Sequence, residues 1–371
     1  MPGWIGQVGE TMEVLVPAEE LESFLNGLVE DESGKYRQVF VPVRAPDDSG
    51  GCFLLSPLQP GIDYSLDDYR SVDPAKVLFY LFREQVSGTD YPGGERLVVG
   101  VKACDLKALQ LLDRALLSED FKDPAYLFWR EHTTVISSDC TSLHPTCHCN
   151  LTEGTPWAEE GFDVNLSRLG DDYLMFSGSS KGESFLEEFR KTAYCLDPGE
   201  ISINGIEERR ASMMELLEDQ NGKGPHPALG GDLRNTPGRE WEIHSEGCVG
   251  CGGCTNICPT CYCLILNDES KEERFVKERS YDSCQLDGYA TVAGGGTPRP
   301  TMTDRFRNRY ICKLQLMERN FGIFGCTGCG RCIEVCPAGI DIRQVSRESV
   351  AAGEKRPPSS SDAAVHSDRG V

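Results

Sequence analysis

The placement of cysteine constrains this chain more than any other feature of its sequence. Twelve of its eighteen cysteines lie between Cys248 and Cys336 in a chain of 371 residues. Two stretches there repeat the spacing C-x2-C-x2-C-x3-C-P without change: Cys248, Cys251, Cys254 and Cys258 before Pro259, and Cys326, Cys329, Cys332 and Cys336 before Pro337. Four thiolates at this spacing predict an iron–sulfur site, and the repeat predicts two.

The spacing also predicts how the two sites share their ligands. Three closely spaced cysteines reach three irons of one [4Fe-4S] cube, and the fourth is directed at the other cube, as in bacterial ferredoxins. We therefore predict two clusters with exchanged fourth ligands: cluster one on Cys248, Cys251, Cys254 and Cys336, and cluster two on Cys326, Cys329, Cys332 and Cys258.

Two other interpretations of these cysteines are weaker. Zinc is usually held by separated C-x2-C pairs, whereas here four close cysteines end in proline. Cys254, Cys258 and Cys261 also spell C-x3-C-x2-C, the spacing of radical S-adenosylmethionine enzymes. In that motif an aromatic residue usually precedes the third cysteine, but Thr260 stands there, and no barrel follows.

Four cysteines in the first half of the chain suggest a third site. Cys104 lies at the expected start of a helix over 105–117, where a helix N-terminus lowers the pKa of a thiol. Cys140 follows an expected strand, and Cys147 and Cys149 share the loop beyond it. Because the ends of parallel strands meet where α/β sheets place ligands, a third cubane on these four cysteines is a hypothesis. Four small buried hydrophobic residues are the alternative, and about twelve irons against about eight would separate the two.

The six remaining cysteines have no firm assignment. Three lie near the first motif and could shield or tune a cluster, or supply ligands: Cys261, Cys263 and Cys284. Three are isolated in sequence and are predicted to be structural: Cys52, Cys195 and Cys312.

The length of the chain allows two or three domains at about 150 residues each. Residues 1–195 alternate strand-like and helix-like segments, which predicts an α/β domain that contains the hypothetical third iron–sulfur site. We expect a helical linker region over 196–245, a mainly α-helical ferredoxin-type dicluster domain over 246–345 and a disordered tail over 346–371.

Periodicity predicts individual elements within this frame. The stripe of Leu106, Leu109, Leu112 and Leu116 marks the apolar face of one helix. Expected strands are 37–43, 51–55, 96–101, 133–137 and 173–176, and expected helices are 73–86, 105–117, 184–193 and 207–219.

Charge and hydropathy exclude some partners. Subtracting 59 Asp and Glu from 37 Lys and Arg leaves a net charge of −22, which repels nucleic acid and anionic membrane surfaces. No apolar run approaches the roughly 20 residues that span a bilayer, and the first residues do not read as a signal peptide. We therefore expect no membrane insertion and a cytoplasmic location, where reduced cysteines bind metal more often than they form disulfides.

Six segments carry a resemblance to a known family: residues 100–116, 123–131, 140–156, 247–263, 281–284 and 326–337. Together they resemble the beta subunits of cytosolic nickel–iron sulfhydrogenases and the A subunit of anaerobic sulfite reductase. Similar chains occur in flavin oxidoreductases that feed heterodisulfide reductase. This chain departs from the family pattern where Tyr281 replaces a usual Trp, where His148 replaces a usual Phe, and over 294–300. These departures leave the branch of the family open.

The resemblance implies an electron-transfer subunit with [4Fe-4S] clusters. It would relay electrons between a flavin subunit that handles NAD(P) and a catalytic subunit of hydrogenase, sulfite reductase or heterodisulfide reductase type. A free ferredoxin-like carrier is an alternative, but such carriers lack some 240 extra residues. A flavin-dependent reductase with its site in the N-terminal domain is another, although no dinucleotide-binding glycine motif and no P-loop occur. The alternating Arg305, Arg307 and Arg309 could face a partner, cluster charge or solvent.

Overall fold

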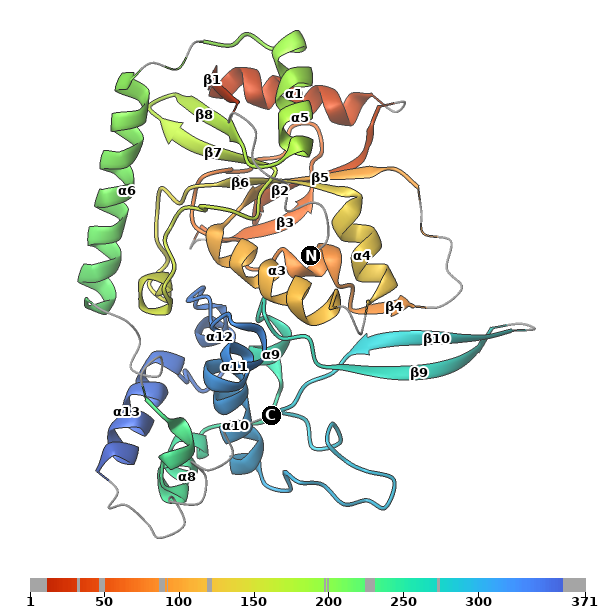
Figure 1. Cartoon of the computed structure of the whole chain (residues 1–371), viewed down its shortest axis with the longest axis vertical. Helices are drawn as coiled ribbons and strands as arrows, with labels where there is room; N and C mark the ends of the chain where they lie inside the picture. The colour runs from red at the N-terminus through yellow and green to blue at the C-terminus, as the bar shows by residue number, and fades with distance from the viewer. Residues whose placement is uncertain are drawn as a thin grey trace.

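A computed structural model describes residues 12–31, 34–46, 51–86, 91, 93–118, 122–196, 198, 200–223, 231–271 and 274–355. They form two regions that lie one above the other (Figure 1). The upper region is built on a large β-sheet, and the lower one contains both cysteine motifs (Figure 1). Helix α6 (Glu200–Asn221) runs down one side and leads from the first region to the second.

The sheet of the first region has seven strands in the order β1-β8-β7-β6-β5-β2-β3. Its centre is parallel, because β2, β5, β6 and β7 pair in the same direction, while β1, β8 and β3 join antiparallel. The strands are β1 (Glu13–Pro17), β2 (Tyr36–Arg44), β3 (Phe53–Pro57), β5 (Glu95–Val101), β6 (Thr133–Ser138), β7 (Val164–Leu169) and β8 (Asp172–Ser177). This mixed sheet with its helices confirms the predicted α/β class.

Helices cover the sheet and bury its apolar side chains. One core cluster includes residues of α1 (Ala18–Glu30) and α5 (Ser180–Thr192). The other includes residues of α2 (Lys76–Phe79), α3 (Ala103–Leu116) and α4 (Pro124–Glu131). The predicted leucine stripe of α3 is buried along its whole length, as the helical period requires.

The helix predicted over 73–86 is wrong. Only α2, four residues long, forms there, and the chain then extends into strand β4 (Arg83–Gln85). Strand β4 is not part of the seven-stranded sheet and pairs instead with β10 of the second region. Tertiary pairing therefore overrides a local helical pattern, as is common for weakly periodic segments.

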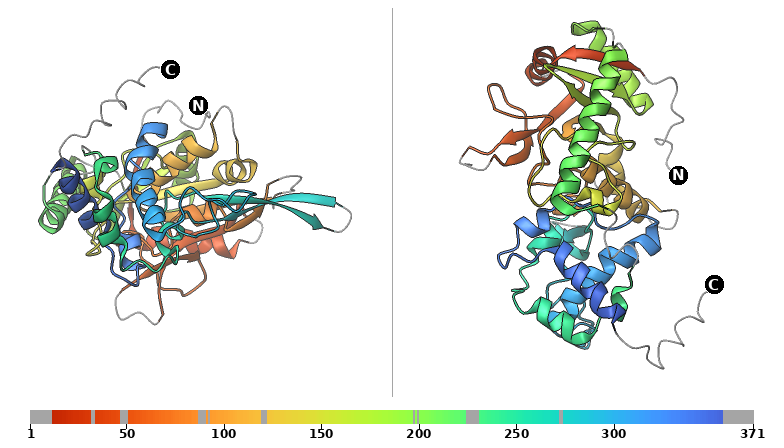
Figure 2. Two further views of the ribbon diagram at one scale, coloured as in Figure 1. Left: turned by 90° about the horizontal axis from the view of Figure 1, so that it is seen from below. Right: turned by 90° about the vertical axis from the view of Figure 1, so that its left-hand side faces the viewer.

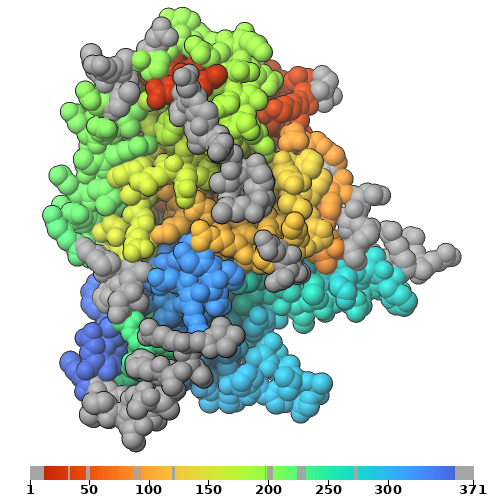
Figure 3. Space-filling model, viewed as in Figure 1, coloured from red at the N-terminus to blue at the C-terminus, as the bar shows by residue number. Residues whose placement is uncertain are grey.

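The second region combines short helices with a long hairpin. The hairpin strands β9 (Leu264–Lys271) and β10 (Arg274–Tyr281) form a three-stranded sheet with β4, and they project from the body of the molecule (Figures 2 and 3). The helices are α8 (Gly238–Ser245), α9 (Gly253–Asn256), α10 (Met302–Ile311), the π-helical turn η3 (Cys312–Leu316), α11 (Met317–Phe321), α12 (Arg331–Glu334) and α13 (Ile342–Glu354). The prediction of a mainly helical domain omitted this hairpin.

Two predicted boundaries differ from those of the structure. Helix α13 continues to Glu354 because Val345, Ser349 and Val350 are buried on one face, so the disordered tail predicted from residue 346 is wrong up to that point. Residues 356–371 lie outside the described residues. In the predicted linker, α6 packs on the first region, whereas α8 packs on α10 and α13 of the second. No described helix is long and apolar enough to cross a membrane.

Candidate metal centres

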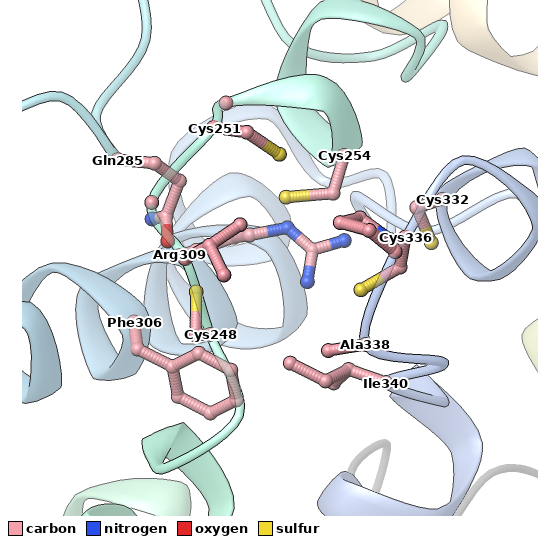
Figure 4. A pocket seen from close by; sticks show the side chains of 14 residues that line it. Cys248, Cys251, Cys254, Gln285, Phe306, Arg309, Cys332, Cys336, Ala338 and Ile340 are labelled. Carbon is pink, nitrogen blue, oxygen red and sulfur yellow. The ribbon is translucent and has the colours of Figure 1, made fainter.

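The first cysteine motif and the last cysteine of the second motif line one cavity. Cys248, Cys251, Cys254 and Cys336 all border it: the first two from the loop before α9, Cys254 from α9 itself and Cys336 from the segment after α12. Figure 4 shows the sulfur atoms of these residues around a shared space. Cys251 is exposed, and the other three are partly buried. The structure thus brings together the four residues predicted for cluster one.

A buried arginine faces this set of thiols. The guanidinium of Arg309, on α10, lies among the cysteine side chains (Figure 4). Its Nε and Nη2 atoms are buried, and no described residue accepts a hydrogen bond from either. Burial raises the pKa of the Cys254 thiol, while Arg309 opposes this rise. Unpartnered cationic donors beside four thiols fit an anionic sulfur-rich group, so the residues present suit an iron–sulfur cluster.

Cys258, the last cysteine of the first motif, lies beside the cysteines of the second motif. Burial raises the pKa of Cys332 to about 12, and Cys326 and Cys258 are among the neighbours that add to it. Cys258 likewise contributes to the pKa of Cys326, which burial raises to about 11. Cys258, Cys326 and Cys329 are buried. The structure thus places Cys258 of the first motif beside Cys326 and Cys332 of the second, and the exchange of the fourth ligands stays a prediction.

The ammonium group of Lys313 lies beside this second group of thiols. Its Nζ donates to the Cys258 thiol at 3.1 Å, to Thr260 Oγ1 at 2.6 Å and to the Gly325 carbonyl at 3.2 Å. A hydrogen bond from Cys261 and the charge of Lys313 hold the pKa of Cys258 well below its usual value, despite burial. Both interactions favour the thiolate form of Cys258, which is the form that binds metal.

The four cysteines of the first region also come together. Cys140 contributes to the raised pKa of both Cys104 and Cys149, and Cys147 contributes to that of Cys140 and Cys149. Cys147 and Cys149 pack with Leu217 of α6, which covers them. The convergence predicted for the third site is thus present, while the ligand role of these thiols stays a prediction.

The predicted effect of the helix N-terminus on Cys104 is wrong. Burial and the neighbouring Asp105 raise the pKa of this thiol well above its usual value. Burial also raises the pKa of Cys140 to about 12, although buried Lys102 opposes the rise. In a low-dielectric site the loss of hydration outweighs a helix dipole, so a bound metal would have to displace these protons.

The loop of the third group packs directly on the loop of the second motif. His148 donates its backbone N–H to the Gly328 carbonyl at 2.7 Å. Gly328 has φ of +68°, and a Cβ there would lie 2.4 Å from Cys149 Cα, so only glycine fits. Cys329 is close enough to contribute to the pKa of both Cys104 and Cys147.

Buried ion pairs fix the two regions against each other. Arg331 of α12 makes a bidentate pair with Asp105 of α3 at 2.7 and 2.8 Å, and both side chains are buried. Arg70 donates to the Cys329 carbonyl at 2.6 Å and pairs with Glu334. Lys76 of α2 donates to the carbonyls of Cys258 and Cys261 at 2.8 and 2.9 Å. These contacts place the first region against the second motif and against the end of the first motif.

These cationic residues escaped the sequence analysis. A single lysine or arginine in a helical segment has no pattern that marks it as buried, and Lys76, Lys313 and Arg331 are all of this kind. Only Arg309 carried a signal, as one of three alternating arginines, and the structure places it toward thiol charge.

The unassigned cysteines fall into two kinds. Cys52 and Cys195 are partly buried in the first region, where Cys52 lies near Tyr69 and Cys195 packs against one core cluster of the sheet. Cys261, Cys263 and Cys284 lie near the second group, and Cys312, predicted to be isolated, lies near Cys263 and Cys258. Among the described residues no three His, Cys, Asp or Glu side chains are arranged to hold a single metal ion.

Comparison with known proteins identifies the family. A 4Fe-4S dicluster domain family matches residues 247–340, which include both motifs. The beta subunit of sulfhydrogenase 2 from Pyrococcus furiosus is 34% identical over 296 residues, covering 77% of this chain and 85% of that subunit. The chain belongs to the sulfhydrogenase beta subunit family. The beta subunit of the F420-dependent formate dehydrogenase of Methanocaldococcus jannaschii is a more distant match, 22% identical over 45% of this chain and 36% of that subunit.

Membership of the sulfhydrogenase beta subunit family confirms the resemblance drawn from the six sequence segments. The chain is an iron–sulfur protein with a 4Fe-4S dicluster domain and an electron-transfer subunit of an oxidoreductase. Zinc is not what such a domain holds, so the zinc interpretation of the two motifs is wrong.

Proposed function

We propose that this chain relays electrons between a subunit that binds flavin and NAD(P) and a catalytic redox subunit of hydrogenase, sulfite reductase or heterodisulfide reductase type. We propose that it holds two [4Fe-4S] clusters with the exchanged ligand sets given above, and a third [4Fe-4S] cluster on Cys104, Cys140, Cys147 and Cys149. The observation that carries this function is that the three thiol groups adjoin in one series, from a covered site to the protein surface.

The contacts between the groups support a series. Cys329 of the second group interacts electrostatically with Cys104 and Cys147 of the third. Cys332 of the second group lines the cavity of the first group. Cys251 of the first group is exposed. Since each group borders the next, charge has a continuous path through the chain.

A bound [4Fe-4S] cluster accepts and releases one electron at a potential that charge, hydrogen bonding and exposure adjust. This chain supplies a cation to each ferredoxin-type group: Arg309 to the first and Lys313 to the second. A nearby positive charge favours the more negative, reduced state. Both residues are buried, so solvent screens their charges little.

The surface near the first group suits a partner subunit. Val249 lines its cavity and is 68% exposed. Val335, which contacts Gly253 beside Cys254, and Ile243 of α8 are also exposed apolar side chains. An apolar patch around a redox site is typical of a docking surface. We therefore place one partner over Cys251.

The test of the relay uses the complete complex, prepared without oxygen. In the variants Cys254→Ala and Cys329→Ala we expect the overall reaction to be lost, while reduction of the flavin in the partner subunit continues. Cys195→Ala, a cysteine outside the three groups, is the matched control and should keep the overall reaction. If both ligand variants keep the overall reaction, the relay is not the function of this chain.

The third cluster has its own test. Cys140→Ala should lower the iron content by about four atoms per chain relative to the unaltered protein, because one cubane carries four irons. Iron and acid-labile sulfide are measured together on the same sample. An unchanged content in Cys140→Ala, beside a clear loss in Cys329→Ala, would show that the first-half cysteines are only buried thiols.

A further inference from the structure

Four cysteines outside the three groups gather beside the second group: Cys261, Cys263, Cys284 and Cys312. We propose that they hold a fourth iron–sulfur cluster. The inference goes beyond the relay proposed above, which uses twelve other cysteines.

The β9–β10 hairpin brings two of the four together. Leu264 pairs with Tyr281 at the open end of the hairpin, and the Asp282 N–H donates to the Cys263 carbonyl at 3.0 Å. The two segments of the hairpin therefore stay side by side beyond the last paired residues of β9 and β10. The Cys263 and Cys284 thiols are hydrogen-bonded to each other. Cys284 is buried. Residues 21 positions apart thus form a fixed thiol pair.

The third member comes from a different element. Cys312 begins the π-helical turn η3 after α10, and such turns are frequent at functional sites. Its thiol interacts electrostatically with those of Cys263 and Cys284. The same turn carries Lys313, whose ammonium group bonds to Cys258 of the second group. The π-turn therefore faces both the second group and the new one.

Cys261 completes the set and links it to the second group. It lies two positions before Cys263, and its thiol is hydrogen-bonded to the Cys258 thiol. The construction repeats that of the third group. There, a C-x-C pair in a loop, one cysteine after a strand and one on a helix converge: Cys147 and Cys149, Cys140, and Cys104. Here the corresponding residues are Cys261 and Cys263, Cys284, and Cys312.

Buried cations and hydrogen-bond donors surround the four thiols. Lys76 and Lys313 are both buried, and both interact with Cys261. Gln285 Nε2 donates to the Cys284 thiol at 3.7 Å, and the Tyr289 hydroxyl is hydrogen-bonded to the Cys263 thiol. Such donors hold and tune the thiolates of metal clusters.

The number of thiols favours a cluster over a disulfide. A disulfide between Cys263 and Cys284 would use two of the four thiols and leave Cys261 and Cys312 without a role. A cluster uses all four, and its ligating thiolates add negative charge near Lys313, which interacts with both Cys263 and Cys312. A cluster here would stand next to the second group, because Cys258 and Cys261 are in contact.

The test compares variants of the full chain purified without oxygen. We expect Cys284→Ala and Cys312→Ala each to lose about four irons and four sulfides per chain relative to the unaltered protein. Cys195→Ala is the matched control and should lose none. Because Cys312 is only partly buried at the start of a turn, Cys312→Ala keeps the test valid if Cys284→Ala does not fold.

Two results would overturn the fourth cluster. One is an iron content that stays unchanged in Cys312→Ala while Cys329→Ala loses a cluster. The other is a Cys263–Cys284 disulfide in peptides of the unaltered protein alkylated under anaerobic conditions. Neither result touches the relay, which fails if Cys254→Ala and Cys329→Ala both retain the overall reaction, so the two proposals can fail independently.

Discussion

The two cysteine motifs have one spacing but opposite surroundings. In the first, Cys251 is exposed and Val249 is 68% exposed. At the equivalent positions of the second, Cys329 is buried and Thr327 is only 3% exposed. The motif therefore defines a loop that binds metal, while the rest of the fold decides whether that loop faces a partner or the interior.

The local backbone of the two motifs is nearly the same. Gly250 and the equivalent Gly328 have φ of +66° and +68°, and each loop leads into a helix of four residues, α9 or α12. The difference begins with the residue before the third cysteine, which is Gly253 in the first motif and Arg331 in the second. Arg331 reaches into the first region and pairs with Asp105. At this position a buried ion pair anchors the second loop to the first region, whereas the first loop has a glycine there.

Loss of this anchor should have the largest effect on stability. Arg331→Ala leaves the Asp105 carboxylate buried without a counter-charge, which costs about 3 to 5 kcal/mol. Chemical unfolding followed by circular dichroism measures the change in the free energy of unfolding. At the equivalent position, Gly253→Ala should change it by less than about 1 kcal/mol, because the added Cβ meets the Val335 side chain at 3.4 Å and Cys251 Sγ at 3.6 Å, both ordinary contact distances.

A double variant separates the charge from the packing. Arg331→Met combined with Asp105→Leu should recover most of the lost stability, because replacing a buried ion pair by apolar side chains is often neutral. Equal stability of Arg331→Ala and Gly253→Ala would contradict the role of the ion pair in the different burial of the two motifs.

The next effect concerns the paired glycines of the two loops. Gly328→Ala and Gly250→Ala carry the same cost of a side chain at positive φ, so this cost cancels in their difference. A Cβ at Gly328 would meet backbone atoms of His148 and Cys149 at 2.4 to 2.5 Å, whereas one at Gly250 meets the flexible end of Met302. We expect Gly328→Ala to be the less stable by about 1 to 3 kcal/mol in the same unfolding experiment.

The two glycine variants should also differ in iron content. Gly328→Ala displaces the loop that carries Cys147 and Cys149, so it should lower the iron content as well as stability. Gly250→Ala should keep its iron, because Met302 can move away. Equal stability and equal iron content in the two variants would show that the loop contact does not fix the third group.

Sequence reasoning found what a local pattern determines. The α3 leucine stripe, the parallel strands β5 and β6 and the two cysteine motifs all have a period or a spacing that depends on neighbours in the chain. The convergence of Cys104 and Cys140 was also predictable, because it follows from the ends of parallel strands.

Sequence reasoning missed what depends on distant contacts. Strand β4 forms only because β10, nearly 200 residues later, pairs with it. The raised pKa of Cys104 comes from burial between the two regions. Its position at a helix N-terminus does not show that the thiol is buried. The position of Cys312 beside Cys263 depends on the π-helical turn η3, and no residue pattern over 312–316 predicts such a turn.

The smallest predicted effect leaves the fold intact and moves one redox potential. Lys313 donates to Cys258 at 3.1 Å, so Lys313→Met removes a positive charge from the second group and should make its reduction potential more negative. A hydrogen bond to a charged group contributes about 1.5 to 3 kcal/mol, of which only the part that differs between oxidation states counts. With about 59 mV for each 1.4 kcal/mol in a one-electron couple, the shift should be on the order of tens of millivolts.

Redox titration followed by electron paramagnetic resonance resolves which cluster responds. Lys313→Met should move the signal of the second cluster, and the first should stay in place because Arg309 supplies its charge. Lys313→Arg, which keeps the charge, should restore most of the potential. Lys223→Met, at an exposed lysine on the surface, is the control and should move neither signal. A shift of both signals by the same amount in Lys313→Met would mean that the two motifs share one electrostatic environment, despite their different burial.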